Sequence, residues 1–152
     1  MDDDLTKALQ SAKEGKFEEW LHDFLSYNPK DEGLLDGLKK QKRYWLQPIE
    51  MELAMLKRTC GPEKEMKYFE AEDVWNKTIG TMKLDLDKGW KPAPLIIEFK
   101  DGKFNVADGN HRMGALINSG YKKYWIAIWA NNEQDYAQVK NMLAMDERNL
   151  TV

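Results

Sequence analysis

The sequence predicts an α/β fold of the mixed α+β kind, in which a small sheet is flanked by helices and follows a helical N-terminal extension. Residues 1–43 place apolar side chains at helical spacing. From Tyr44 onward the pattern changes, and the runs 95–99 and 124–129 are short, apolar and typical of strands. We therefore expect a helical extension over residues 1–43 and an α/β domain over residues 44–152.

Within the extension, the apolar spacing predicts three amphipathic helices. Gly15 separates the first two, and Asn28-Pro29 ends the second. The expected ranges are 2–14, 16–27 and 31–43. We expect this all-helical segment to cap the domain that follows it.

The first part of the α/β domain has a weaker pattern. A strand or extended segment is expected near residues 44–52, where Pro48 indicates a sheet edge or a bend. Residues 59–62 have the composition of a turn or loop. Residues 71–87 return to helical spacing and predict a helix.

The second part of the domain carries the clearest pattern. Asp101-Gly102 is a pair suited to the positive φ angles of a tight hairpin turn. Gly120 is placed to end a helix, and the following apolar run predicts a central strand buried on both faces. The expected elements are strands 95–99 and 104–107, a helix over about 109–119, a strand 124–129 and a helix 132–145.

The amino-acid composition limits the binding partners and the cellular compartment that we expect. Of 152 residues, 42% are hydrophobic and 32% charged, and the net charge of −3 disfavours DNA, whose phosphates attract a basic surface. The single Cys60 leaves no intrachain disulfide and indicates a reducing compartment. One cysteine and two separated histidines, His22 and His111, argue against a structural zinc site. Neither a signal peptide nor a membrane span is expected, so we expect a cytoplasmic protein without membrane contact.

The stretch Asp108-Gly109-Asn110-His111-Arg112 is the main candidate site. It joins a strand to a helix, and the N–H groups at a helix N-terminus attract anions. Gly109 allows a ligand to approach the backbone, Arg112 could bind a phosphate bidentately, and His111 could donate to a phosphoryl oxygen. The alternative is a plain helix start, with Asp108 as the N-cap and Arg112 in a surface ion pair.

Carboxylates near this turn suggest further chemistry. Asp108 could hold Mg²⁺ against the phosphates or orient a substrate hydroxyl, rather than cap the helix. Glu50 and Glu52 alternate along the expected strand, so both point to one face, and one could act as a general base. The alternative for these two is an ordinary solvated strand face. Cys60 would need a nearby base to act as a nucleophile, and its sequence neighbours supply none.

Aromatic residues are numerous enough to include a ligand-facing wall. Some of Trp75, Trp90, Trp125 and Trp129 could stack on a base, although most are expected in the core.

Residues 94–129 resemble the ParB/sulfiredoxin-like superfamily, with a weaker match over residues 44–87. The resemblance rests on Pro94-Leu95-Ile96-Ile97, Asp108-Gly109-Asn110-His111-Arg112, Ala115-Leu116, Gly120 and Ile126-Ala127-Ile128. In that superfamily a Gly-x-x-Arg or Gly-x-His-Arg turn binds nucleotide phosphates. The resemblance therefore implies nucleotide binding by Gly109, Asn110, His111 and Arg112.

Differences from the superfamily pattern reduce the number of activities that the resemblance implies for this chain. Sulfiredoxins have a catalytic cysteine where this chain has Asn110, so the chain is not expected to be a sulfiredoxin. ParB proteins carry a DNA-binding region after this domain, and only about twenty residues follow the last strand here. The free-serine kinases share an Asp-Gly-x-His-Arg turn and take a glutamate base from the first-strand region. That resemblance points to Glu50 or Glu52.

The sequence thus predicts a nucleotide-binding protein, with ATP or another nucleotide and Mg²⁺ as cofactors. It could be a kinase or a nucleotide hydrolase acting on an unknown small-molecule acceptor. His111 would then contact the transferring group, and Asp108 or a glutamate would orient the nucleophile. The alternative is a non-catalytic ParB-like module that binds a protein or a nucleic-acid partner. Convergence of Asp108, His111, Arg112 and one glutamate in a single pocket would favour the enzyme.

Overall fold

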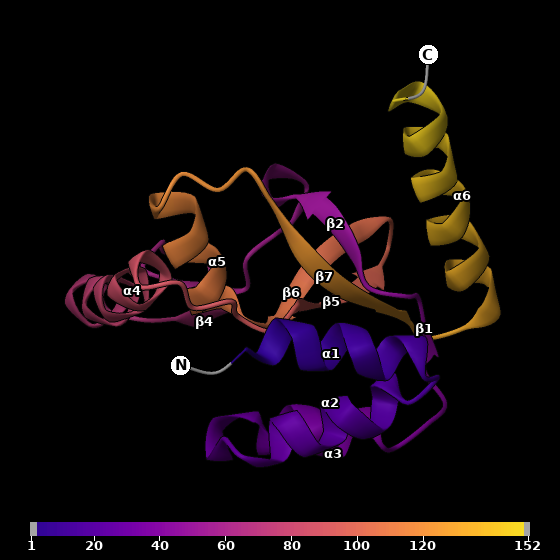
Figure 1. Ribbon diagram of the computed structural model, residues 1–152, viewed down its shortest axis with the longest axis horizontal. Coiled ribbons are helices and arrows are strands. Elements are labelled where there is room, and N and C mark those ends of the chain that lie inside the picture. Colours follow the sequence, from indigo (N-terminus) through magenta and orange to yellow (C-terminus); the bar gives the residue numbers. More distant parts are fainter. Residues whose placement is uncertain (1–2, 151–152) are drawn as a thin grey trace.

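A five-stranded mixed sheet lies between two groups of helices (Figure 1). The computed structural model describes residues 3–150, with side chains described up to residue 144. None of the helices in this part of the chain combines the length and the apolar character that crossing a membrane requires. The mixed α/β fold with a small sheet flanked by helices confirms the fold class that the sequence predicts.

The N-terminal extension forms three helices, as predicted. They are α1 (Asp4–Lys13), α2 (Phe17–Ser26) and α3 (Glu32–Leu38), and the short 3-10 helix η1 (Pro29–Asp31) leads into α3. The third helix ends at Leu38 rather than near residue 43, because the Arg43 guanidinium folds back and donates to the carbonyls of Gly37 and Leu38. These are carbonyls that the end of a helix leaves without a partner.

The main sheet has the strand order β1-β7-β5-β6, and β2 also pairs with β7. Its strands are β1 (Tyr44–Trp45), β2 (Ile49–Glu52), β5 (Leu95–Lys100), β6 (Lys103–Asp108) and β7 (Lys123–Ala130). The strand β7 runs parallel to β5 and antiparallel to β1 and β2, so it is central as predicted. The single extended segment predicted over 44–52 is broken into two strands around Pro48, which cannot donate to a ladder.

Residues predicted as a plain loop contribute to a second, small sheet. Here β3 (Cys60–Gly61) pairs in parallel with β4 (Tyr68–Phe69). The helix α4 (Glu72–Asp87) follows, close to the predicted range 71–87. The remaining helices, α5 (Asn110–Asn118) and α6 (Glu133–Leu150), also lie near their predicted positions, α6 continuing beyond the predicted end at 145.

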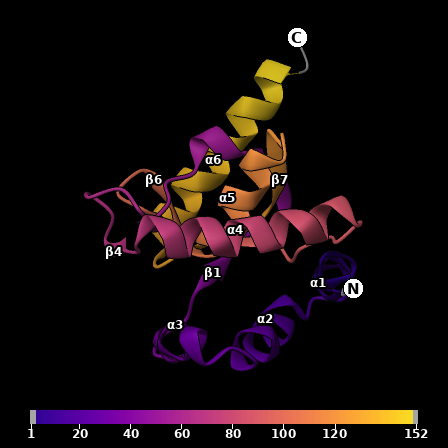
Figure 2. The same cartoon turned by 90° about the vertical axis from the view of Figure 1, so that its left-hand side faces the viewer.

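Alternating side chains of the central strands separate two apolar cores. On one face, Ile97, Ile126 and Ile128 pack with residues of α4 and α5. On the other face, Ile96 and Ala127 pack with α1–α3. Figure 2 shows α1–α3 grouped together on one side of the molecule, apart from α4. The extension therefore shares a core with the sheet, whereas the division of the chain at residue 43 stays a prediction.

Candidate functional site

The turn from β6 into α5 depends on Gly109. Gly109 occupies the N-cap with a φ of 103°, which L side chains rarely adopt. A Cβ there would lie 2.8 Å from both Arg112 Nη2 and Leu95 Cδ2. Residue 109 therefore has to be glycine both for its backbone angle and for space, because Arg112 and Leu95 pack against it.

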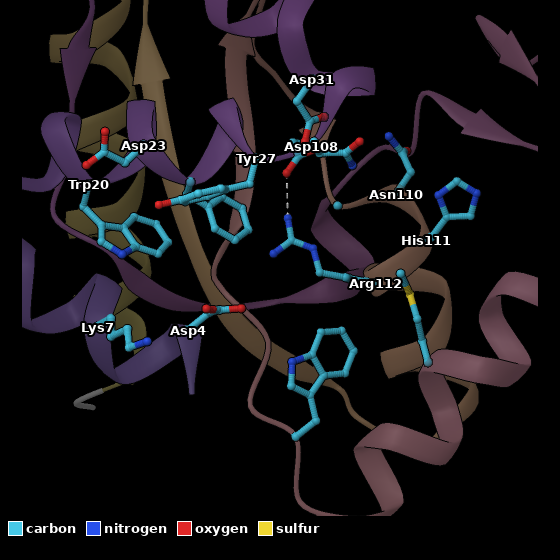
Figure 3. A pocket seen from close by; sticks show the side chains of 15 residues that line it. Asp4, Lys7, Trp20, Asp23, Tyr27, Asp31, Asp108, Asn110, His111 and Arg112 are labelled. Atoms are coloured by element: carbon cyan, nitrogen blue, oxygen red, sulfur yellow. Dashed lines mark hydrogen bonds and ion pairs between the residues drawn. The ribbon is translucent and has the colours of Figure 1, made fainter. Parts of the chain in front are cut away.

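The turn opens into a cavity of about 770 Å³ whose other wall is formed by the N-terminal extension (Figure 3). Four aromatic residues line this cavity, namely Trp20, Phe24, Tyr27 and Trp90. Trp20 and Phe24 stack on each other, with ring centroids 4.9 Å apart. Of the tryptophans singled out from the sequence, only Trp90 is among the described lining residues, because Trp75 and Trp129 are buried in the two cores.

The Arg112 side chain is buried beside the cavity and links three parts of the chain. Its side chain is 9% exposed and donates to Asp108 Oδ2 at 2.8 Å and to the Ala93 carbonyl at 2.8 Å. Its guanidinium also lies over the Phe24 ring. Arg112 thus joins α5, the end of β6 and the loop before β5, and it is not a surface residue.

Asp108 does not cap α5, because its side chain pairs with Arg112 and Gly109 takes the N-cap position. Asp31, the last residue of η1, lies against it (Figure 3). Burial, followed by the hydrogen bond and the negative charge of Asp108, raises the pKa of Asp31 to about 7. Sequence reasoning missed Asp31, since nothing local distinguishes it from any acid at a helix start.

The cavity as a whole carries more acid than base. The acidic lining residues are Asp4, Asp23, Asp31 and Asp108. The basic ones are Lys7 and Arg112, and Arg112 is already paired with Asp108. An anionic ligand would therefore meet repulsion here unless it arrived with a cation.

Asn110 uses its side chain to build the fold. Its Oδ1 accepts from the backbone N–H groups of Thr59 and Cys60 at 2.7 and 3.1 Å. Its Nδ2 donates to Thr59 Oγ1. The amide is buried, so Asn110 fastens the strand β3 to the first turn of α5 and has only its backbone N–H to offer a ligand.

His111 turns away from Asp108 and Arg112, toward β3 and β4 (Figure 3). Its Nε2 lies 2.8 Å from Glu70 Oε1, and Trp75 packs against the ring with centroids 4.7 Å apart. Cys60 completes this group, and its thiol lies near both side chains. Glu70 was not anticipated from the sequence, in which it stands 41 residues from His111.

The two predicted base candidates are not brought to the turn. Glu50 and Glu52 lie on β2 with exposed side chains, paired across the ladder with Trp125 and Lys123. Neither is among the described residues that line the cavity. The predicted convergence of Asp108, His111, Arg112 and a β2 glutamate is thus partial, and Asp31 occupies the place expected for the glutamate.

Comparison with known proteins returns structural likeness only. No protein-family model matches the chain, and no curated protein matches it. The chain is similar to a Pnob8-like ParB-N domain, with 17% identity and a TM-score of 0.42 over 61% of this chain and 32% of that chain. It is similar to sulfiredoxin from Arabidopsis thaliana, with 13% identity and a TM-score of 0.42 over 61% of this chain and 96% of that one.

A third match is the C-terminally truncated chromosome-partitioning protein ParB from Caulobacter crescentus complexed with CTP-γ-S, with 18% identity and a TM-score of 0.35 over 60% of this chain and 49% of that one. The names of these proteins are those of the superfamily that the sequence resembles. At TM-scores of 0.35 to 0.42 these matches carry no argument about this chain, so the function has to be argued from the site.

Proposed function

We propose that the chain binds a nucleotide, as its magnesium complex, in the cavity between α1–α3 and the turn Asp108–Arg112. The observation that carries this proposal is the pairing of two unlike walls across one cavity. One wall is the N-terminus of α5, where backbone N–H groups of the first helical turn can bind an anion. The facing wall is aromatic.

The aromatic wall suits a nucleobase. Base stacking on aromatic side chains tolerates any base, because every base has a π-face. Trp20 and Phe24 already form a stacked pair, and Tyr27 lines the same cavity with its side chain largely exposed to solvent. A cavity of about 770 Å³ falls within the usual range for small-molecule and cofactor sites.

The carboxylates favour the magnesium complex over the free nucleotide. Asp31 and Asp108 lie next to the first turn of α5, where the phosphates would bind. Oxygen ligands of this kind hold Mg²⁺, which in nucleotide sites is usually shared between one or two carboxylates and the phosphates. Mg²⁺ would turn the repulsion between acid and phosphate into attraction.

Asp31 is the residue best suited to proton transfer, should the bound nucleotide be a phosphoryl donor. With a pKa near 7 it can accept a proton from an acceptor hydroxyl at neutral pH. Glu50 and Glu52 are too remote from the cavity lining to take this part. The proposed activity is that of a kinase or a nucleotide hydrolase. ATP is the proposed nucleotide, and a small molecule is the proposed acceptor.

A thermal-shift panel tests the binding proposal. ATP, ADP, CTP and GTP at millimolar concentration, with and without Mg²⁺, are applied to wild type, Tyr27→Ala, Asp108→Asn and the control Tyr121→Ala. Tyr27 and Tyr121 are both exposed, but only Tyr27 lines the cavity. A nucleotide at ten times its Kd adds roughly 1.4 kcal/mol, or about 3–5 °C in a domain of this size.

We expect at least one nucleotide to stabilise wild type and Tyr121→Ala in the presence of Mg²⁺. The shift should shrink in Tyr27→Ala and lose its Mg²⁺ dependence in Asp108→Asn. No shift with any nucleotide would overturn the proposal. A shift that both cavity variants retain in full would place the binding elsewhere on the molecule.

A further inference from the structure

Three side chains of metal-ligating types meet next to the cavity, toward β3 and β4, and of these only His111 is among the residues that line the cavity. One ligand atom each from Cys60, Glu70 and His111 lies within 4.8 Å of the other two. They come from three separate elements: β3, the end of β4 and the first turn of α5. The side chains of Glu70 and His111 are 23% and 26% exposed, so an ion could reach the group from solvent.

We propose that Cys60, Glu70 and His111 bind a divalent transition-metal ion, zinc being the best fit, with a fourth position left for water or a ligand. Thiolate, imidazole and carboxylate are the three side-chain types that ligate zinc in proteins. Three protein ligands with an open fourth position are the pattern of zinc sites that take part in chemistry, whereas structural sites are closed by four.

The distances fit a site that needs little rearrangement. Bonds of about 2.0–2.3 Å at tetrahedral angles separate ligand atoms by about 3.3–3.6 Å. Glu70 Oε1 and His111 Nε2 now lie 2.8 Å apart in a hydrogen bond, and all three ligand atoms lie within 4.8 Å. Each pair therefore needs to adjust by at most about 1.5 Å.

Each ligand is also held by its surroundings. The backbone N–H of Cys60 donates to Asn110 Oδ1, which ties the residue to α5. The backbone N–H of Glu70 donates to the Gly61 carbonyl at 2.9 Å. The ring of His111 packs against Trp75. Ligands fixed in this way lose little freedom when an ion binds.

The same three residue types could instead form a nucleophile with a base, but their arrangement favours an ion. In a nucleophile–histidine–carboxylate relay, the nucleophile and the carboxylate bind opposite nitrogens of the imidazole. Here the thiol and the carboxylate lie close to each other as well as to the ring, because all three ligand atoms are within 4.8 Å of one another.

The charge around the group suits a cation. With a thiolate and a carboxylate the three ligands carry two negative charges, which a divalent ion neutralises. Arg58 is a neighbouring cation, but it is paired with Glu63 and lies over the Trp75 ring. The sulfur and nitrogen ligands select a transition metal over Mg²⁺, which prefers oxygen.

Cobalt titration of the untagged chain without nucleotide tests this site. Co²⁺ reports a bound thiolate through a charge-transfer absorption in the near ultraviolet, and Zn²⁺ should displace it. The variants are Cys60→Ser and Glu70→Gln. Their controls are His22→Gln, which removes the other histidine, and Glu65→Gln, an exposed acid of the same segment.

We expect wild type and both controls to bind one Co²⁺ per chain with the thiolate band. Cys60→Ser should lose the band, and Glu70→Gln should bind at least about tenfold more weakly. A spectrum without the band, or a band and affinity unchanged in Cys60→Ser and Glu70→Gln, would overturn the proposal. Because no nucleotide is present, the outcome is independent of the proposed nucleotide site, and Asp108→Asn should leave it unchanged.

Discussion

The two sides of the first turn of α5 differ in the chemistry they present. On the cavity side, Asp31 and Asp108 offer carboxylate oxygens beside the buried guanidinium of Arg112. On the β3–β4 side, Cys60 and His111 offer sulfur and nitrogen, with one carboxylate from Glu70. Oxygen donors suit Mg²⁺ and phosphate-bound cations, whereas sulfur and nitrogen suit zinc. The comparison shows how one five-residue turn can offer two kinds of ligand atom, because Asp108 points toward the cavity and His111 points toward β3 and β4.

The two sides also differ in how they are built. The cavity side depends on α1–α3, which pack on the sheet through an apolar core. The β3–β4 side depends on hydrogen bonds, chiefly those of the Asn110 amide to Thr59 and Cys60. Substitutions should therefore perturb one side without the other, and the following predictions use that separation, from the largest expected effect to the smallest.

Asn110→Ala should cause the largest loss of stability, and the loss should arise on the β3–β4 side. It leaves the backbone N–H groups of Thr59 and Cys60 without their acceptor in a partly buried region, at a cost of about 2–4 kcal/mol in unfolding free energy. Urea unfolding measures this, with Asn118→Ala on the exposed end of the same helix as the control. A loss no greater than that of the control would contradict the structural role given to this amide.

Gly109→Ala should disturb both sides at once. The alanine must adopt a φ of 103° and place its Cβ 2.8 Å from Arg112 and Leu95, so we expect a loss of about 2–3 kcal/mol. Gly120→Ala is the matched control, because its φ is 90° but its Cβ would meet open space, and strain alone costs about 1–2 kcal/mol. Equal losses in the two variants would show that the close packing around Gly109 contributes nothing.

Asp31→Asn should change how stability depends on pH. The folded chain keeps the Asp31 proton up to about pH 7, while the unfolded chain releases it near the ordinary pKa of 3.8. The folded state therefore binds more protons between these values, and stability falls as the pH rises through this window. Solvent exposure of Asp31 reduces the size of the effect.

Thermal unfolding from about pH 5 to pH 8 measures this change. The melting temperature of Asp31→Asn should fall less over that range than that of wild type or of Asp36→Asn, an exposed acid on α3. A steeper or identical fall in Asp31→Asn would refute the raised pKa.

Glu50→Gln and Glu52→Gln should change little. Both side chains are exposed on β2, so we expect changes within about 0.5 kcal/mol and unaltered nucleotide-dependent shifts. Loss of nucleotide binding in either variant would restore the sequence-based hypothesis that a β2 glutamate belongs to the site.

The features that the sequence predicts best are those fixed by neighbouring residues. Asp101 and Gly102 have φ angles of 54° and 74°, as the hairpin signal predicts, and Gly120 ends α5 with a φ of 90°. The run 124–129 is apolar because β7 is buried on both faces, and this too can be read locally.

The parts that the sequence could not predict are contacts between distant residues. Asp31 meets Asp108 across 77 positions of the chain, and Glu70 meets His111 across 41. No spacing rule relates such pairs. Counting one cysteine and two histidines argues against a structural zinc site, but it leaves out the Glu70 carboxylate, whose place beside Cys60 and His111 is set by the pairing of β3 with β4. Asn110 shows the same limit, because its role depends on where residues 59 and 60 fold.

A crossed pair of variants tests the separation of the two sides most directly. Asp108→Asn and Cys60→Ser are each measured for the Mg²⁺-dependent nucleotide thermal shift and for the cobalt–thiolate absorption. We predict that Asp108→Asn loses the Mg²⁺ dependence and keeps the absorption, while Cys60→Ser loses the absorption and keeps the nucleotide shift. Loss of both properties in both variants would contradict the account, because the turn would then hold one site and not two.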